Sequence, residues 1–251
     1  MLTLGIETSG SCGGISICRD STLIAKLALS TSQTHSRRLV PSIKWLMERS
    51  GIGMDELQCV AVSIGPGSFT GLRIGLSTAR GFAISLGIDI SGVPTLDVLA
   101  AAVPPLPDML LFPLIDARNS RFYTACYAAG EKGDAWTRVS PFMITTAGKL
   151  HEAHLKLMAE PDGLLLKTLS GRKLPSIMFT GDALATCGED IRGAFSGSST
   201  LFTPEWMWHP DPSLVAALAG RFLLPQSRQD SIVPLYVKLS QAEERRQAAG
   251  Q

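Results

Sequence analysis

Charge is scarce in this chain. Asp, Glu, Lys and Arg make up 18% of its 251 residues, the formal net charge is +1, and the pI is about 7.7. A protein that grips nucleic acid on its own usually carries a basic face or stripe, so this composition argues against independent binding and leaves most phosphate contacts to a partner. Hydrophobic residues make up 45% of the chain. That share excludes intrinsic disorder and suffices for one large core or two small ones.

Long apolar runs, a secretory leader and paired cysteines are also missing. The most apolar stretch, residues 98–115, is interrupted by prolines and cannot form an unbroken membrane helix. The first residues, MLTLGIETSG, lack the basic and apolar regions of a signal peptide. The five cysteines are odd in number and show no CxxC spacing, which favours reduced, buried thiols. We therefore expect a cytoplasmic protein with no membrane partner.

Hydrophobic periodicity is present, and it changes from strand to helix period along the first half. Period-2 alternation with tight turns predicts three antiparallel strands, and a helical spacing of apolar residues follows. A nearly continuous apolar run then predicts a strand buried on both faces, followed by a glycine turn, a helix and a short strand. The expected elements are strands at 2–7, around 15–17, 22–29, 58–64 and 88–93, and helices at 35–50 and 70–86.

The second half repeats this order without repeating the sequence. Its expected strands are residues 109–116, 121–128, 135–144 and 177–182, and its expected helices are 145–160, 183–192 and 213–223. A duplicated β-β-β-α-β-α unit is the order of the two-lobed ribonuclease-H-like fold of the actin, Hsp70 and hexokinase superfamily (ASKHA), an α/β fold. With the proline cluster as the boundary, we expect lobes at 1–105 and 106–230, and a tail at 231–251 that is partly disordered or packs back.

The most distinctive segment is GPGSFTGLRIG, residues 65–75, between a buried strand and a helix. Gly65 and Gly67 permit a tight turn that Pro66 stiffens. Gly71, Gly75 and Ala79 then form a stripe of small residues on the helix. Such a stripe allows close packing inside the lobe or against a helix of another subunit, and the sequence leaves both open.

Catalytic interpretations of this loop are weak. Its glycine spacing is one residue longer than GxGxxG, and it follows the fourth strand rather than the first. Ser68 is not in a GxSxG context, and no His–acid pair suggests a triad. The helix N-terminus could hold an anion, but no lysine follows as it does in a P-loop.

Several segments together resemble the TsaB/YeaZ family, the paralogue of the TsaD-type threonylcarbamoyltransferase. The similar segments run in order from residue 6 to about residue 243: IETS (6–9), HSRRLVPSI (35–43), GPGSFTGLRIG (65–75), IDARNSRFYTACY (115–127) and PLYVKLSQAE (234–243). The family's signature loop falls on Gly65, Pro66, Gly67, Ser68, Phe69 and Thr70.

The resemblance implies a non-catalytic scaffold. Such a subunit binds a TsaD-type catalytic subunit, is completed by a TsaE-type ATPase, meets tRNA only through the complex, and self-associates as a homodimer when alone. The complex would make N6-threonylcarbamoyladenosine beside the tRNA anticodon. The alternatives are a nucleotide-binding, kinase-like enzyme and a glycoprotease-like peptidase of the same superfamily. The expected partner interface comprises Leu39, Ile43, Leu46, Met47, Gly71, Arg73, Gly75 and Ala79.

The resemblance also implies that catalytic groups are missing. TsaD-type paralogues carry an HxxxH metal pair where this chain has Thr95 and Leu99. The glycine-rich phosphate loop of the second lobe corresponds here to IDARN, residues 115–119, in which Asp116 and Arg118 form either a structural ion pair or an interface contact. We therefore expect no catalytic, cofactor-binding or metal-binding residues.

The remaining candidate residues have structural explanations. His151 and His154 lie at i and i+3 of an expected surface helix without a third ligand nearby, so we do not expect them to bind metal. Glu7 stands where kinases of the superfamily place an acid that positions metal and phosphate. Without counterparts in the second lobe, Glu7 is expected to cap the turn at residues 9–14.

Overall fold

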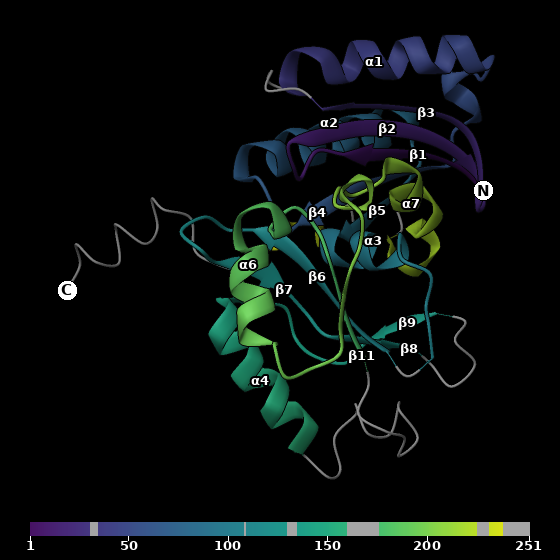
Figure 1. Cartoon of the computed structure of the whole chain (residues 1–251). Helices are drawn as coiled ribbons and strands as arrows, with labels where there is room; N and C mark the ends of the chain where they lie inside the picture. Colours follow the sequence, from purple (N-terminus) through teal and green to yellow (C-terminus); the bar gives the residue numbers. More distant parts are fainter. Residues whose placement is uncertain (31–34, 108, 130–134, 160–175, 225–230, 238–251) are drawn as a thin grey trace. The chain divides into compact units, whose positions relative to one another are not determined.

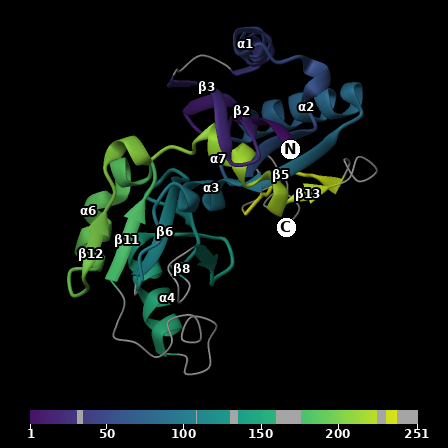
Figure 2. The same cartoon turned by 90° about the vertical axis from the view of Figure 1, so that its right-hand side faces the viewer.

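The computed structural model describes residues 1–30, 35–107, 109–129, 135–159, 176–224 and 231–237. Contacts within the chain divide it into two compact units, which Figures 1 and 2 show from two sides. Unit 1 consists of Met1–Val98 and Pro210–Gln251, and unit 2 consists of Leu99–His209. Unit 2 is thus inserted in the sequence of unit 1. Within the described ranges, no helix is long and apolar enough to cross a membrane.

Unit 1 is built on a six-stranded sheet with the order β13-β5-β4-β1-β2-β3. Its strands are β1 (Leu2–Glu7), β2 (Cys12–Arg19), β3 (Thr22–Ser30), β4 (Cys59–Gly65), β5 (Asp89–Pro94) and β13 (Leu223–Leu224). The first three form the expected antiparallel meander. β4 then pairs parallel to β1, and β5 parallel to β4. As the continuous apolar run predicts, the side chains of β4 are almost all buried.

Helices cover both faces of this sheet. Apolar residues of α1 (His35–Ser50) and α2 (Phe69–Leu86) share one core with β1, β2 and β4. A second, smaller cluster on the opposite face joins residues of β4 and β5 to α3 (Thr95–Ala101), α7 (Pro212–Ala217) and the 3₁₀ turn Ala219–Arg221. Figure 1 shows α1 and α7 on opposite sides of strands β1 to β3. A further 3₁₀ turn, Met54–Glu56, precedes β4.

Unit 2 repeats the layout with shorter strands. The main path of its sheet has the order β10-β7-β6-β11-β12, and β8 and β9 pair beside β6. α4 and α6 lie side by side (Figure 1), and their apolar residues close the core around Phe112, Phe179 and Phe195. The elements are β6 (Met109–Asp116), β7 (Phe122–Thr124), β8 (Tyr127–Ala129), β9 (Trp136–Arg138), β10 (Met143–Thr145), α4 (Ala147–Ala159), β11 (Ser176–Thr180), α6 (Leu184–Ala194), β12 (Thr200–Phe202) and the 3₁₀ turn Glu205–Met207.

The structure confirms the two-lobed α/β fold class but changes the expected range of the second lobe. Residues 213–223 were expected in the lobe at 106–230, whereas α7 packs on β1 and β2 and β13 pairs with β5. Glycines make this close packing possible: a Cβ at Gly5 would lie 2.5 Å from the carbonyl oxygen of Pro212, and one at Gly14 would lie 2.9 Å from Pro212 Cγ. The two strand glycines are therefore the sequence signal for this contact.

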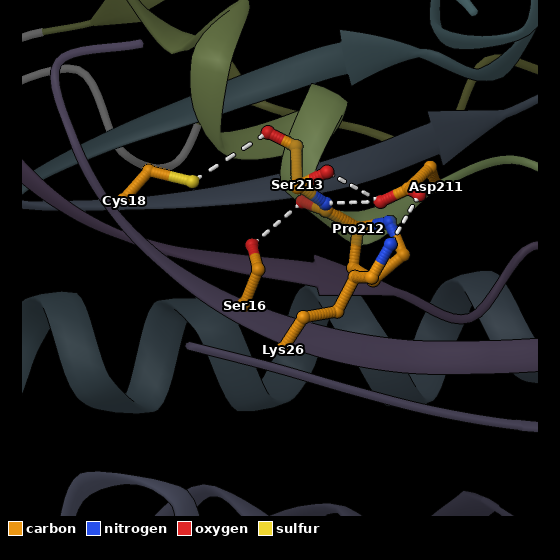
Figure 3. Close-up of polar contacts among 6 residues, drawn as sticks. All are labelled: Ser16, Cys18, Lys26, Asp211, Pro212 and Ser213. Atoms are coloured by element: carbon orange, nitrogen blue, oxygen red, sulfur yellow. Dashed lines mark hydrogen bonds and ion pairs between the residues drawn. The ribbon is translucent and has the colours of Figure 1, made fainter. Parts of the chain in front are cut away.

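Polar contacts fix the start of α7 to the meander (Figure 3). Lys26 Nζ lies 2.6 Å from Asp211 Oδ2, and Asp211 Oδ1 accepts a hydrogen bond from the backbone N–H of Ser213 as the helix N-cap. Ser16 Oγ donates to the carbonyl oxygen of Pro212 at 2.7 Å. Cys18 Sγ makes a longer, weaker contact of 3.7 Å to the carbonyl oxygen of Ser213.

Candidate functional site

The glycine loop is fixed to the end of β1. Ser68 caps α2, because its Oγ accepts from the N–H of Gly71, and its own N–H donates to Ser9 O at 2.6 Å. A Cβ at Gly67 would lie 2.3 Å from that same Ser9 oxygen. Gly65 has φ +110, a conformation that side-chain-bearing residues rarely adopt. The signature loop Gly65–Thr70 is therefore a structural joint between β4, α2 and the turn at Ser9.

Glu7 sits beneath this joint and is fully buried. Its Oε1 accepts from the N–H and the Oγ of Ser9, at 2.6 and 2.5 Å, and its Oε2 accepts from Ser63 Oγ. Glu7 thus caps the following turn, as expected, and in addition links β1 to β4. Burial raises the pKa of Glu7 although these hydrogen bonds oppose the shift, and the charge of Asp211 raises it further.

The expected partner interface proves to be largely internal. Seven of its eight residues are buried: Leu39, Ile43, Leu46, Met47, Gly71, Gly75 and Ala79. A Cβ at Gly71 would lie 2.0 Å from Thr8 O, and one at Gly75 would lie 2.2 Å from Thr8 Oγ1. The small-residue stripe therefore packs against Thr8, directly after β1, and against β4, and the apolar residues of α1 pack into the core of unit 1. Only Arg73 of the expected set is exposed.

Other residues form the solvent-facing sides of α1 and α2. On α1, Val40 and Trp45 are about half exposed, and the Arg49 guanidinium lies 6.0 Å from the Trp45 ring. On α2, Ile84 is 64% exposed, and Gly81 has open space where a Cβ would lie. The signal that could have found these residues is an apolar residue out of phase with the buried stripe of its helix.

One end of this surface is a cluster of Phe69, Arg73 and Tyr236. The rings of Phe69 and Tyr236 stack with their centroids 5.6 Å apart. The Arg73 guanidinium lies 3.9 Å from the Phe69 centroid, and its Nε donates to Tyr236 Oη at 3.3 Å. Tyr236 belongs to the PLYVKLSQAE segment. Its residues 234–237 are described, whereas residues 238–243, and with them the end of the expected tail at 231–251, lie outside the described residues.

In unit 2, the IDARN residues make backbone contacts. Asp116 Oδ1 accepts from the N–H of Arg118 at 2.8 Å, and the N–H of Asp116 donates to Asp182 Oδ1 at 2.9 Å. Among the described residues no ion pair joins Asp116 to Arg118. Of the two expected alternatives, the ion pair is therefore replaced by a turn, and the interface contact stays a prediction. Burial raises the pKa of the Asp182 carboxyl.

The two histidines of α4 lie against aromatic residues. His154 is only 7% exposed and contacts Phe112 and Phe195, and His151 meets Phe195 edge-on at 4.8 Å. The expectation of a surface position was therefore wrong for His154, since this side of α4 closes the core of unit 2. Burial lowers the pKa of His154, and the neighbouring His151 adds to the shift. Within the described ranges, no group of three or more His, Cys, Asp or Glu side chains could hold a metal ion.

Comparison with known proteins now identifies the family. The family model of TsaD, the tRNA N6-adenosine threonylcarbamoyltransferase, matches residues 28–245. The chain belongs to the TsaD family. Within the TsaD family it falls in the TsaB/YeaZ group: it is 38% identical to the threonylcarbamoyladenosine biosynthesis protein TsaB of Bacillus subtilis over 127 residues, and 31% identical to that of Escherichia coli over 134 residues.

These matches with TsaB are partial. They cover 51% and 53% of this chain, and the chain spans 55% and 58% of the two relatives. A tRNA N6-adenosine threonylcarbamoyltransferase of Nitratidesulfovibrio vulgaris is 27% identical over 248 residues, with 90% of this chain and 68% of the relative covered. YeaZ from Pseudomonas aeruginosa matches 94% of this chain and 99% of its own with a TM-score of 0.69 and 17% identity, which supports the shared fold.

Proposed function

We propose that this chain is a non-catalytic subunit that binds a TsaD-type threonylcarbamoyltransferase in the modification of tRNA adenosine to N6-threonylcarbamoyladenosine. A TsaE-type ATPase completes the complex, and the chain contacts tRNA only as part of this complex. Relatives named for threonylcarbamoyladenosine biosynthesis support the pathway. The observation that carries the binding role is the apolar, solvent-facing surface of α1 and α2.

Two positions support a role without chemistry of its own. Leu99, at the place of the second histidine of the paralogue's metal pair, is fully buried and has no donor atom for a metal. Glu7, at the place of the acid that positions metal and phosphate in related kinases, accepts hydrogen bonds from Ser9 and Ser63 on its two carboxylate oxygens. In the described structure these hydrogen bonds hold together the end of β1, the turn at Ser9 and β4.

The partner surface that we propose differs from the one expected from the sequence. It consists of the exposed residues Val40, Trp45, Phe69, Arg73, Gly81 and Ile84. Exposed aromatic, arginine and isoleucine side chains on adjacent helices suit a protein interface, in which a few such anchors supply most of the binding energy. The same surface would serve self-association of the isolated chain.

A titration of the purified chain with the TsaD-type protein of the same organism tests the proposal. We expect Ile84→Asp to weaken binding at least about tenfold, because it buries a charge in an apolar contact. Ile84 is mostly exposed, so the melting temperature should be unchanged. Leu201→Asp is the matched control, since Leu201 is also an exposed apolar residue but lies on β12 of unit 2. Undiminished binding by both Ile84→Asp and Trp45→Ala would reject this surface.

A further inference from the structure

Arg73 is held in one orientation before any partner arrives. Its guanidinium stacks on Phe69 one helical turn earlier, 3.9 Å from the ring centroid, and its Nε donates to Tyr236 Oη. Tyr236 in turn stacks on Phe69. An exposed arginine normally loses rotamer freedom when it binds, and an arginine that is already ordered avoids much of that entropic cost.

The position of Tyr236 is itself fixed by the segment 231–237. Ile232 is buried in the core of unit 1, and Arg80 of α2 donates to its carbonyl oxygen. The N–H of Leu235 donates to the carbonyl oxygen of Ile64 at 2.7 Å. A Cβ at Gly65 would lie 3.0 Å from Leu235 O, so a glycine at this position lets the segment approach β4 closely. The segment therefore holds Tyr236 in place, and Tyr236 in turn orients Arg73.

The charge of Arg73 has no acidic partner in the described part of the chain. The ion pairs found there involve Asp20, Asp211 and Glu48, none of them with Arg73. Because Nε is occupied by Tyr236, the two terminal nitrogens remain to receive a ligand. Their paired N–H groups match the two oxygens of a carboxylate.

We propose that Phe69, Arg73 and Tyr236 form an anchor that receives a Glu or Asp side chain of the TsaD-type partner. This inference rests on the proposed function and adds the charge that the partner must present. The residues around Arg73 and the low net charge of the chain favour a protein carboxylate over an RNA phosphate as the ligand. Along the same helix face follow the uncharged residues Ser77 and Gly81 and the exposed, apolar Ile84, which suit a protein contact better than a phosphate, and the whole chain has a net charge of only +1.

The test measures the affinity of the full chain for the purified TsaD-type protein at low and high salt. We expect Arg73→Ala to weaken binding about 30-fold at low salt, which is the size of an interface hot spot. It should also flatten the salt dependence, because the charge-assisted contact is the part that salt screens. Arg73→Lys should recover only part of the loss, since an ammonium neither stacks on Phe69 nor binds a carboxylate through two parallel bonds.

Two further variants separate positioning from contact. Tyr236→Phe keeps the stacked ring but removes the acceptor for Nε, so we expect a loss of about three- to tenfold with an unchanged melting temperature. Arg221→Ala is the matched control, an exposed arginine of unit 1 in the 3₁₀ turn on the opposite face of the sheet. It should bind like the wild type.

The outcomes distinguish this inference from the proposed function. If Ile84→Asp abolishes binding while Arg73→Ala binds like the wild type at all salt concentrations, the anchor is rejected and the docking surface stands. If the wild-type chain does not bind the TsaD-type protein, the proposed function itself fails. If Arg73→Ala binds the partner normally but loses affinity for tRNA in a filter-binding assay, the anchor serves a phosphate and the inference is overturned.

Discussion

Replacing Gly75 with leucine puts a side chain into space that Thr8, directly after β1, and Val62 of β4 already fill. The first added atom would lie 2.2 Å from Thr8 Oγ1 and 3.3 Å from Val62 Cγ2. Thr8 Oγ1 donates a buried hydrogen bond of 2.8 Å to the carbonyl oxygen of Gly71. The leucine must therefore displace α2 from the sheet or break this bond.

The cost can be estimated from these contacts. Overpacking in a closed core costs about 1–3 kcal/mol, and loss of a buried hydrogen bond costs about 1 kcal/mol more. A total of about 3 kcal/mol corresponds to a fall in melting temperature of about 6–12 °C for a chain of this size. Thermal melts of the isolated chain measure this change.

Gly81→Leu is the matched control on the same helix. Apart from its neighbours in the helix, no atom of the described residues lies within 4 Å of the position where its Cβ would be, so the fold can accept the side chain. Leucine is favoured over glycine within a helix by about 0.5–1 kcal/mol, so the melting temperature should stay level or rise. Binding to the TsaD-type protein should nevertheless fall, because the new side chain stands on the proposed docking surface. Equal melting temperatures for the two variants would refute the assignment of the buried and exposed sides of α2.

Three further predictions concern charged and titrating groups. Burial raises the pKa of Glu7, so its contribution to stability is lost as pH rises above the ordinary titration range of a glutamic acid; urea melts of Glu7→Gln should show a flatter pH dependence than the wild type, and an equal slope would contradict this. Burial lowers the pKa of His154, so unfolding should become easier as pH falls through the ordinary range of histidine, and His154→Leu should remove that trend. Asp211→Ala should cost about 1–2 kcal/mol through loss of the N-cap, whereas Asp211→Asn, which keeps an acceptor oxygen, should cost clearly less in the same melts.

Local periodicity was sufficient to predict most of the fold. Strands β1 to β5 of unit 1 and the helices α1 and α2 follow from apolar spacing, which depends only on residues near one another in sequence. The position of α7 could not be predicted from local periodicity, because its contact with β1 and β2 depends on the shape of the assembled sheet. Gly5 and Gly14 lack the Cβ atoms that would clash with Pro212, and this effect appears only when the strands are paired.

The candidate site was harder to predict for a related reason. The apolar stripe of α1 and the small-residue stripe of α2 correctly mark the packed sides of both helices, but a stripe does not say whether it meets its own sheet or another subunit. Leu39 and Gly75 were placed on an interface, although both face the core. Arg73 was the exception, since a charged side chain on the outer side of an amphipathic helix is expected to face solvent. Its partner Tyr236 lies 163 residues away in the sequence and had no local signal.

The insertion of unit 2 into the sequence of unit 1 sets the order in which the two can mature during synthesis. Domains generally fold as units while the ribosome adds residues, and unit 2 is continuous from Leu99 to His209, so it is whole once that stretch has emerged. Unit 1 begins earlier yet is completed later, because α7 and β13 arrive only after residue 210. Until then Pro212 does not pack on Gly5 and Gly14, and Lys26 cannot form its ion pair with Asp211. The N-terminal strands therefore emerge from the ribosome well before β13 completes their sheet. A chain stopped before residue 210 would expose the face of β1 and β2 on which α7 packs.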